Sequence, residues 1–443
     1  MSTIPTVLGL RENWPQFTLL VIINGFVGGI IGLERTLLPE LAEQEFGLVA
    51  RTALLSFIVV FGVSKAFTNY FTGALANRVG RKNLLVYGWL FGLPVPLILM
   101  FAPSWNYIVL ANVLLGINQG LCWSSTVVMK IDLVGEKNRG LAMGINESAG
   151  YLSIALVAFG TGYLASRYGI RPYPFLMGAG FAVIGLVGSI FLVKDTASHV
   201  KLETGRSGQQ KLLNVFWDTT FAHSNLGAVT QAGLVNNLND GMVWGLLPVL
   251  LSLKGFSLEQ IGVIVATYPA VWGVGQLFTG ALADKYCKKR LLFYGMFLQG
   301  VAIVLFPWAI AFWHFMTISA LLGLGTAVVY PTFLAAIASD THPEQRAASM
   351  GVFRFWRDLG YAIGALLTGI LADWVGIYPS ILVVGGLTIF SALIIQFRMA
   401  CQKKNLTNRR RNRQDHWCRP VNGLPLSGSN GAKKDFIKEK VKF

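Results

Sequence analysis

Twelve long apolar runs constrain this chain more than any other feature of its sequence. They lie at about 16–39, 51–76, 83–101, 105–130, 140–166, 173–193, 221–253, 258–283, 290–310, 312–339, 347–373 and 378–398. A helix needs about 20 apolar residues to cross the hydrocarbon core of a bilayer. We therefore predict an all-α membrane protein with twelve transmembrane helices, because only helices satisfy their own backbone groups in lipid.

The charged residues fit this prediction. They make up only 13% of the 443 residues, and Lys and Arg give the chain a formal net charge of +16. In a soluble protein such an excess would suggest nucleic-acid binding, but here the basic residues lie in connecting segments and in the last 45 residues. We therefore expect no nucleic-acid partner. The four cysteines, Cys122, Cys287, Cys401 and Cys418, are spaced too widely for a zinc site, so we interpret them as structural thiols and expect no metal.

The distribution of Lys and Arg predicts the orientation. With both termini in the cytoplasm, sixteen basic residues outside the tail fall in inside segments and only four in outside segments. Positive charge is enriched on the cytoplasmic side of membrane proteins. We expect an integral protein of the cytoplasmic (plasma) membrane, present as a monomer, with both termini cytoplasmic.

An internal repeat divides the chain. The segment FTGALANRVGRKNLLVYG at 71–88 recurs as FTGALADKYCKKRLLFYG at 278–295, with eleven of eighteen positions identical and an offset of 207 residues. The same offset pairs Arg139 with Arg346. A constant offset indicates a duplication, with a substrate path expected between the two halves.

The repeat predicts four regions. Residues 1–193 form the N-terminal six-helix half, and residues 221–398 form the C-terminal half. The polar stretch 194–220 is the cytoplasmic linker between them. The basic tail 399–443 has too few apolar residues to fold alone, so we expect it to be disordered. It either contacts anionic lipid or remains solvated.

The repeated loop resembles a family motif. Gly73, Arg78, Gly80, Arg81 and Lys82 match the pattern Gly-x-x-x-Asp-Arg-x-Gly-Arg-Lys of the major facilitator superfamily, and Gly280, Asp284 and Lys285 match it in the second copy. Asp132, Glu136 and Arg139 are similar to the family's Asp…Glu…Arg-Gly run after the fourth span. The resemblance covers residues 16–398. It implies that the two halves rock around a central site lined by helices 1, 4, 7 and 10.

The resemblance also implies a conformational role for this loop, carried by Gly73, Arg78, Gly80, Arg81, Lys82, Asp132, Gly280, Asp284 and Lys285. Glycine at a helix end closes a turn tightly, and the basic side chains can pair with a carboxylate or with helix carbonyl ends. The acidic position of the motif is Asn77 in the first copy and Asp284 in the second. Both a charge latch and simple anchoring of the loop inside the cell remain open.

Ionisable residues inside the spans are the main candidates for function. Each costs about 2.5–3.5 kcal/mol on insertion scales. The spans hold eight, namely Glu34, Arg35, Lys65, Glu147, Asp240, Arg354, Arg357 and Asp358. Glu147 and Arg354 are mates at the 207 offset, and each lies about 12 Å into its span. We expect an acid of one half to face a base of the other near the midplane.

We assign roles to these residues as follows. Glu147 and Asp240 are the proton-coupling candidates, because a carboxylate in a partly dry cavity can exchange a proton. Lys65 and Asp358 are predicted to form an interface ion pair. The predicted substrate contacts are Lys65, Asn118, Gln119, Trp123, Tyr330, Arg354 and Arg357. Whether the charged cluster is structural or contacts substrate remains open.

We therefore predict a secondary active transporter that moves a small organic solute by alternating access. The predicted mode of transport is proton-coupled efflux. We expect no cofactor, and we expect an ion gradient of protons to drive transport. A uniporter or importer of an organic anion is one alternative, and a non-transporting receptor or scaffold is another. Efflux proteins of the family usually carry an arginine where this chain has Asn112, so Glu147 would have to supply the missing chemistry. The sequence has no Gly-x4-Gly-Lys-Ser/Thr loop, and we predict no enzyme activity.

Overall fold

The computed structural model describes residues 6–47, 50–205 and 207–401, and the regular elements within these ranges are all helices or helical turns. The elements are α1 (Trp14–Phe46), α2 (Ala50–Val79), α3 (Arg81–Gly92), α4 (Pro94–Phe101), α5 (Trp105–Val134), α6 (Arg139–Tyr168), α7 (Tyr173–Phe191), α8 (Ala197–Thr204), α9 (Val215–Trp217), a π-helical turn (Asp218–Ala222), α10 (Ser224–Leu253), α11 (Leu258–Lys285), α12 (Lys288–Leu305), a 3-10 turn (Phe306–Trp308), α13 (Phe312–Asp340), α14 (Arg346–Val375) and α15 (Ile377–Arg398).

The predicted spans coincide with these long helices. The run 83–101 is divided between α3 and α4, where Pro94 starts the second helix. Among the described residues, ten stretches are long and apolar enough to cross a membrane. The other two predicted spans correspond to α2, which carries Lys65 and Asn69, and to α10, which carries Asp240. The all-α membrane fold is confirmed.

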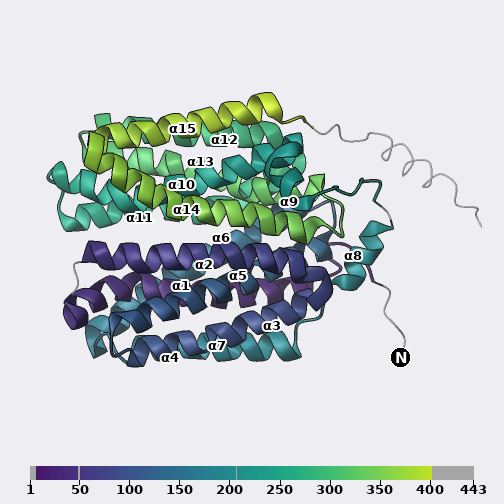
Figure 1. The fold of residues 1–443 in the computed structure, drawn as a ribbon, viewed down its shortest axis with the longest axis horizontal. Coiled ribbons are helices and arrows are strands. Elements are labelled where there is room, and N and C mark those ends of the chain that lie inside the picture. Colours follow the sequence, from purple (N-terminus) through teal and green to yellow (C-terminus); the bar gives the residue numbers. More distant parts are fainter. Residues whose placement is uncertain (1–5, 48–49, 206, 402–443) are drawn as a thin grey trace, which may run out of the picture. The chain divides into compact units, whose positions relative to one another are not determined.

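The helices gather in two groups, α1–α7 and α10–α15 (Figure 1). In the first group α1 packs against α6, and α2 packs against α5. In the second group the corresponding pairs are α10 with α14 and α11 with α13. Between the groups, α2 packs against α14 and α6 packs against α11. We call the end of the bundle that carries the α5–α6 connection, the α13–α14 connection and α8 the linker end.

Repeated glycines let the two groups approach closely. A Cβ atom at Gly73 would lie 2.4 Å from the carbonyl oxygen of Ala347 in α14, and one at Gly280 would lie 2.6 Å from that of Gly140 in α6. Both contacts are with backbone, so no side chain fits there. Gly73 and Gly280 thus lie inside α2 and α11. The turn expected of a glycine at a helix end is made by Gly80, whose φ is 88°.

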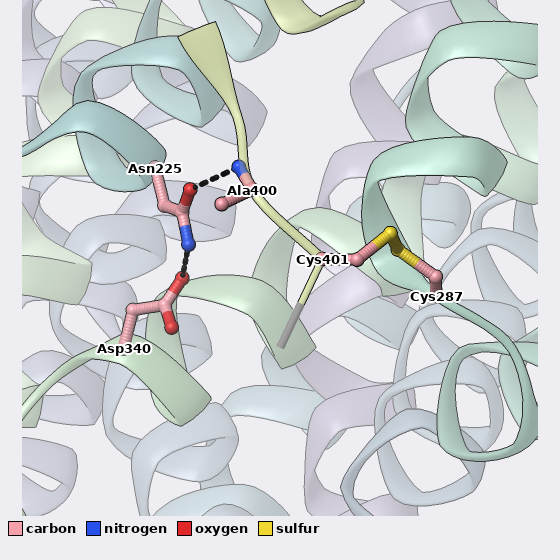
Figure 2. Close-up of a disulfide and its surroundings, with 5 residues drawn as sticks. All are labelled: Asn225, Cys287, Asp340, Ala400 and Cys401. Atoms are coloured by element: carbon pink, nitrogen blue, oxygen red, sulfur yellow. Dashed lines mark hydrogen bonds between the residues drawn. A yellow bond between two sulfur atoms is a disulfide. The ribbon is translucent and has the colours of Figure 1, made fainter. Parts of the chain in front are cut away.

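A disulfide joins Cys287 to Cys401 at the linker end, with the two Cα atoms 5.7 Å apart (Figure 2). Beside it, the backbone N–H of Ala400 donates to Asn225 at 2.8 Å, and Asn225 donates to Asp340 at 3.1 Å. These contacts hold the segment after α15 against α10, α12 and α13. The interpretation as structural thiols was therefore wrong for Cys287 and Cys401, whereas Cys122 is free and buried. Cys418 and the tail lie outside the described residues.

The glycine crossing predicts a position-specific loss of stability. Gly280→Leu should destabilise the protein by about 1–3 kcal/mol, because its side chain would force α11 away from α6. Gly262→Leu is the matched control, since it changes the same helix α11 at a glycine with nothing within 4 Å. Thermal unfolding in detergent measures both. Equal effects at the two positions would contradict the close packing.

The disulfide predicts a labelling pattern. Purified under air, the full chain should show no alkylation at Cys287 or Cys401, and both should be labelled after reduction with dithiothreitol. Mass spectrometry of proteolytic fragments reads both sites. Labelling of the two cysteines without reductant would contradict the disulfide.

Candidate functional site

The centre of the interface between the two helix groups holds a buried ion pair. Arg354 Nη2 in α14 lies 3.5 Å from Glu147 Oε1 in α6, and both side chains are fully buried. The two residues are repeat mates, so the duplication places them on corresponding helices. The two groups of helices are therefore joined through opposite charges at equivalent positions.

Glu147 also has partners from its own helix group. Trp123 Nε1 of α5 donates to Glu147 Oε1 at 3.2 Å, and the Asn146 amide donates to the same oxygen at 2.7 Å. Lys130, fully buried in α5, donates to the side-chain oxygen of Asn146. Within the described part of the chain, Glu147 Oε2 has no hydrogen-bond partner. Oε1 of Glu147 is thus held by hydrogen bonds, and Oε2 is available for a further partner.

A second charged group lies on α14. Arg357 donates to Asp358 Oδ1 through both Nε, at 2.9 Å, and Nη2, at 2.5 Å. Asn69 of α2 donates to Asp358 Oδ2 at 2.5 Å. Arg357 and Asn69 thus supply the hydrogen bonds of the Asp358 carboxylate, and the interface pair between Lys65 and Asp358 stays a prediction. Lys65 Nζ faces aromatic rings, 5.5 Å from that of Phe61.

Aromatic rings surround these charges. The rings of Tyr151 and Trp272 lie 4.0 Å apart between centroids, and the hydroxyls of Tyr151 and Tyr330 are 3.1 Å apart. The guanidinium of Arg357 lies 5.3 Å from the Tyr330 ring, and Lys65 Nζ lies 5.7 Å from the Trp123 ring. Cations over aromatic faces are favourably placed. These residues come from both helix groups, so the aromatic surface also crosses the interface.

We call the charged residues Lys65, Lys130, Glu147, Arg354, Arg357 and Asp358 the central cluster. By formal charge, it has four cations and two carboxylates, so positive charge is in excess. Arg354 Nε and Nη1 and Arg357 Nη1 are buried without hydrogen-bond partners in the residues that the structure describes. Buried donors without a partner are unfavourable. The cluster therefore offers donors suited to an anionic group.

Asp240 lies in a separate polar site inside the second helix group. The hydroxyl of Tyr268 in α11 donates to Asp240 Oδ1 and lies 3.3 Å from Thr326 Oγ1 in α13. In the same group, Asn239 donates to Gln299 Oε1 at 3.1 Å. Asp240 thus has partners within its own helix group, and Glu147 pairs with Arg354 of the other group.

The two predicted amide contacts in α5 are used in helix packing. Asn118 donates to the carbonyl oxygen of Gly88 in α3 at 2.9 Å, and Gln119 donates to that of Val27 in α1 at 2.8 Å. Both side chains are fully buried. Asn118 and Gln119 therefore connect α5 to α3 and α1.

Some residues of the repeated loop join a charge network at the linker end. Asp132 Oδ2 of α5 lies 3.0 Å from Arg81 Nε and accepts from the Thr196 hydroxyl at 2.8 Å. Arg346 Nη1 of α14 lies 3.7 Å from Asp132 Oδ1. Asp284 accepts from two backbone N–H groups at the start of α6. These contacts connect the two helix groups.

Other loop residues point elsewhere. Arg78 and Lys285 are exposed. The Lys82 ammonium donates to the carbonyl oxygen of Ile190 at 2.8 Å, and its backbone N–H donates to Asp195 at 3.0 Å. Lys82 therefore fixes the loop to the end of α7.

Sequence reasoning missed several members of these sites. Lys130, the last residue of the predicted span 105–130, is absent from the predicted candidates although it is fully buried. No sequence pattern distinguishes Tyr151 and Trp272 from the many other aromatic residues of the chain. Glu203 lies in the linker, where no periodic pattern marks a contact, yet it pairs with buried arginines. No group of three His, Cys, Asp or Glu side chains in the described ranges could hold a metal ion.

Comparisons with known proteins agree with this architecture. The sequence model of the Major Facilitator Superfamily matches residues 17–235 and 229–440. The multidrug resistance protein MdtG of Citrobacter koseri is 22% identical over 400 residues, which cover 86% of this chain and 94% of that protein. MdtG of Salmonella schwarzengrund is also 22% identical, over 86% of this chain and 95% of its own length.

Among solved structures, the human organic anion transporter MFSD10 (TETRAN) superposes with a TM-score of 0.71 at 17% sequence identity. The superposition covers 86% of this chain and 99% of that one. At this level of identity the likeness concerns the fold. Together with the family match along nearly the whole chain, it identifies the protein as a secondary transporter that belongs to the major facilitator superfamily.

Proposed function

We propose that this transporter couples the movement of a small organic solute to protons at Glu147, in the direction of export. The observation that carries the proposal is the contact between Glu147 and Arg354, which joins the two helix groups through buried opposite charges. A movement that separates α6 from α14 breaks this contact. An ionised carboxylate left buried without its partner is strongly unfavourable.

Protonation of Glu147 removes that cost, because a neutral carboxyl group needs no counter-charge. Trp123 and Asn146 belong to the same helix group as Glu147 and move with it. They hold one oxygen in place while the other is free to take a proton. Proton binding at Glu147 is thus linked to the separation of the two groups.

The direction of transport is proposed from the relatives. Two relatives that match 86% of this chain are called multidrug resistance proteins. We extend export from them to this chain as a proposal. Asp240 remains the second proton-carrier candidate, with the Tyr268 hydroxyl as its donor.

Uptake of an organic anion together with a proton is the second candidate function. It is favoured by the excess of cations in the central cluster and by the buried donors of Arg354 and Arg357. An anion bound to Arg354 would displace Glu147, and the displaced carboxylate would then take up a proton. The adjacent rings of Tyr151, Trp272 and Tyr330 suit a substrate with an aromatic body.

We also propose that the linker end faces the cytoplasm, that the protein lies in the cytoplasmic membrane with both termini inside, and that it acts as a monomer. The loop arginines and lysines at this end support the orientation. The lipid contact of the basic tail lies outside the described residues.

The proposal predicts proton movement driven by solute. Purified protein in vesicles with a pH dye inside is mixed with ethidium, a planar aromatic cation, or with a naphthalenesulfonate, a permanently charged aromatic anion. Solute that enters in exchange for protons raises the luminal pH, whereas solute that enters with protons lowers it. This sign does not depend on how the protein is oriented, so it separates export by exchange from uptake by co-transport.

Glu147→Gln should reduce the proton signal to that of protein-free vesicles, because the amide cannot exchange a proton. Asp240→Asn is the comparison at the second carboxylate. Solute-driven proton movement that persists in Glu147→Gln would contradict the assignment of Glu147. Uptake of solute without any pH change in the parent protein would contradict proton coupling.

A further inference from the structure

The linker end is closed asymmetrically. Asp284, at the end of α11, accepts from the backbone N–H groups of Gly140 at 2.8 Å and of Leu141 at 2.9 Å, at the start of α6. The first N–H groups of a helix lack partners within it and carry partial positive charge, so a carboxylate is well placed there. This carboxylate of the second helix group thus holds a helix of the first.

The repeat mate of Asp284 makes a different contact. It is Asn77, whose side-chain N–H donates to the carbonyl oxygen of Glu344 at 2.5 Å and whose oxygen accepts from Arg81 at 2.9 Å. An amide brings no negative charge to the start of α14. The duplication therefore left one of the two equivalent contacts without its acid.

A carboxylate from the linker reaches this position. Glu203, on α8, accepts from Arg346, the first residue of α14, through both oxygens at 2.9 and 2.8 Å. Its Oε1 also pairs with Arg139, the first residue of α6. Arg139 and Arg346 are repeat mates, and both are buried. One carboxylate thus joins the equivalent ends of the two helix groups.

The segments on either side of α8 contact different helix groups. On one side the Thr196 hydroxyl donates to Asp132 of α5 at 2.8 Å. On the other, the Leu212 N–H donates to Gln345 at 2.7 Å, and the Gln345 amide donates back to the Leu212 carbonyl at 3.0 Å. When the groups separate at this end, Glu203 must therefore give up at least one of its arginines.

We propose that Glu203 replaces the acid lost at Asn77 and that this linker carboxylate holds the linker end closed. Glu203 acts as a positioning residue that sets the balance between the closed and open states of this end. The inference rests on the movement of the two halves in the proposed function, and it needs neither proton coupling nor a known substrate.

The electrostatics of Glu203 agree with this role. Burial raises the pKa of Glu203, but the hydrogen bond from Arg346 and the charge of Arg139 lower it more, so its pKa lies below the ordinary value of 4.5. A lowered pKa means that the stabilisation is present above pH 4.5 and is lost only as the pH falls through the folded-state value. Glu203 is therefore ionised at neutral pH.

Accessibility at the linker end tests the proposal. Ser125 is buried and lines a small cavity together with residues of α2 and α14, such as Thr72 and Met350. Ser125→Cys serves as the reporter in the full-length chain in detergent, and the parent chain, which keeps Cys122 and Cys418, gives the background rate. Adding Glu203→Gln should raise the rate of maleimide labelling by about tenfold, because opening no longer breaks an ion pair.

Asn77→Asp should return the labelling rate of the Glu203→Gln reporter toward that of the reporter alone, since an acid is restored at the start of α14. This rescue would also establish that the Glu203 variant is folded. Glu344→Gln is the matched control, because it removes one carboxylate at the same end, where Glu344 pairs with the exposed Lys211. It should leave the rate unchanged.

An unchanged rate in Glu203→Gln, or an equal rise in Glu344→Gln, would overturn the role of Glu203. A rise that Asn77→Asp does not reverse would overturn its equivalence to the missing acid. The assay uses neither solute nor a pH gradient. A failure of proton coupling at Glu147 would therefore not change the labelling rates. The two proposals are tested independently.

Discussion

The contact between Glu147 and Arg354 is the interaction on which the rest of this structure depends. Both side chains are fully buried, at equivalent positions of a duplicated sequence, and each belongs to a different helix group. Neither charge is tolerable there alone, because a buried charge without a counter-charge is strongly unfavourable. In the proposed function, the arrangement of the two groups therefore depends on the charge state of the Glu147 carboxyl group.

The same principle recurs at the linker end. There the repeat mates Arg139 and Arg346 have like charges, and the carboxylate of Glu203 joins them. In the centre, the mates themselves have opposite charges. Close crossing of helices at Gly73 and Gly280 brings the groups together between these two levels. A duplicated fold thus supplies equivalent positions, and divergence of the residues at those positions supplies charges that meet across the interface.

The sequence predicts the fold well because its signals are local or periodic. Apolar runs of bilayer length indicate the helices, and the 207 offset identifies Glu147 and Arg354 as mates at similar depth. Side-chain partners are harder to predict. Asp358 bonds to its neighbour Arg357 rather than to Lys65, which depends on rotamers and on the position of Asn69. Cys287 and Cys401 are 114 residues apart, and no spacing rule links them.

The most direct test of this account is a double-mutant cycle on the central pair, measured as the free energy of unfolding of purified protein. The variants are Glu147→Gln, Arg354→Gln and the two combined. We predict that the double variant is less destabilised than the sum of the single ones, with a coupling free energy of about 0.5–3 kcal/mol. The Arg354→Gln variant should have a lower free energy of unfolding than the double variant, because it leaves a buried carboxylate without its cation. Simple additivity would contradict the claim that this pair joins the two halves.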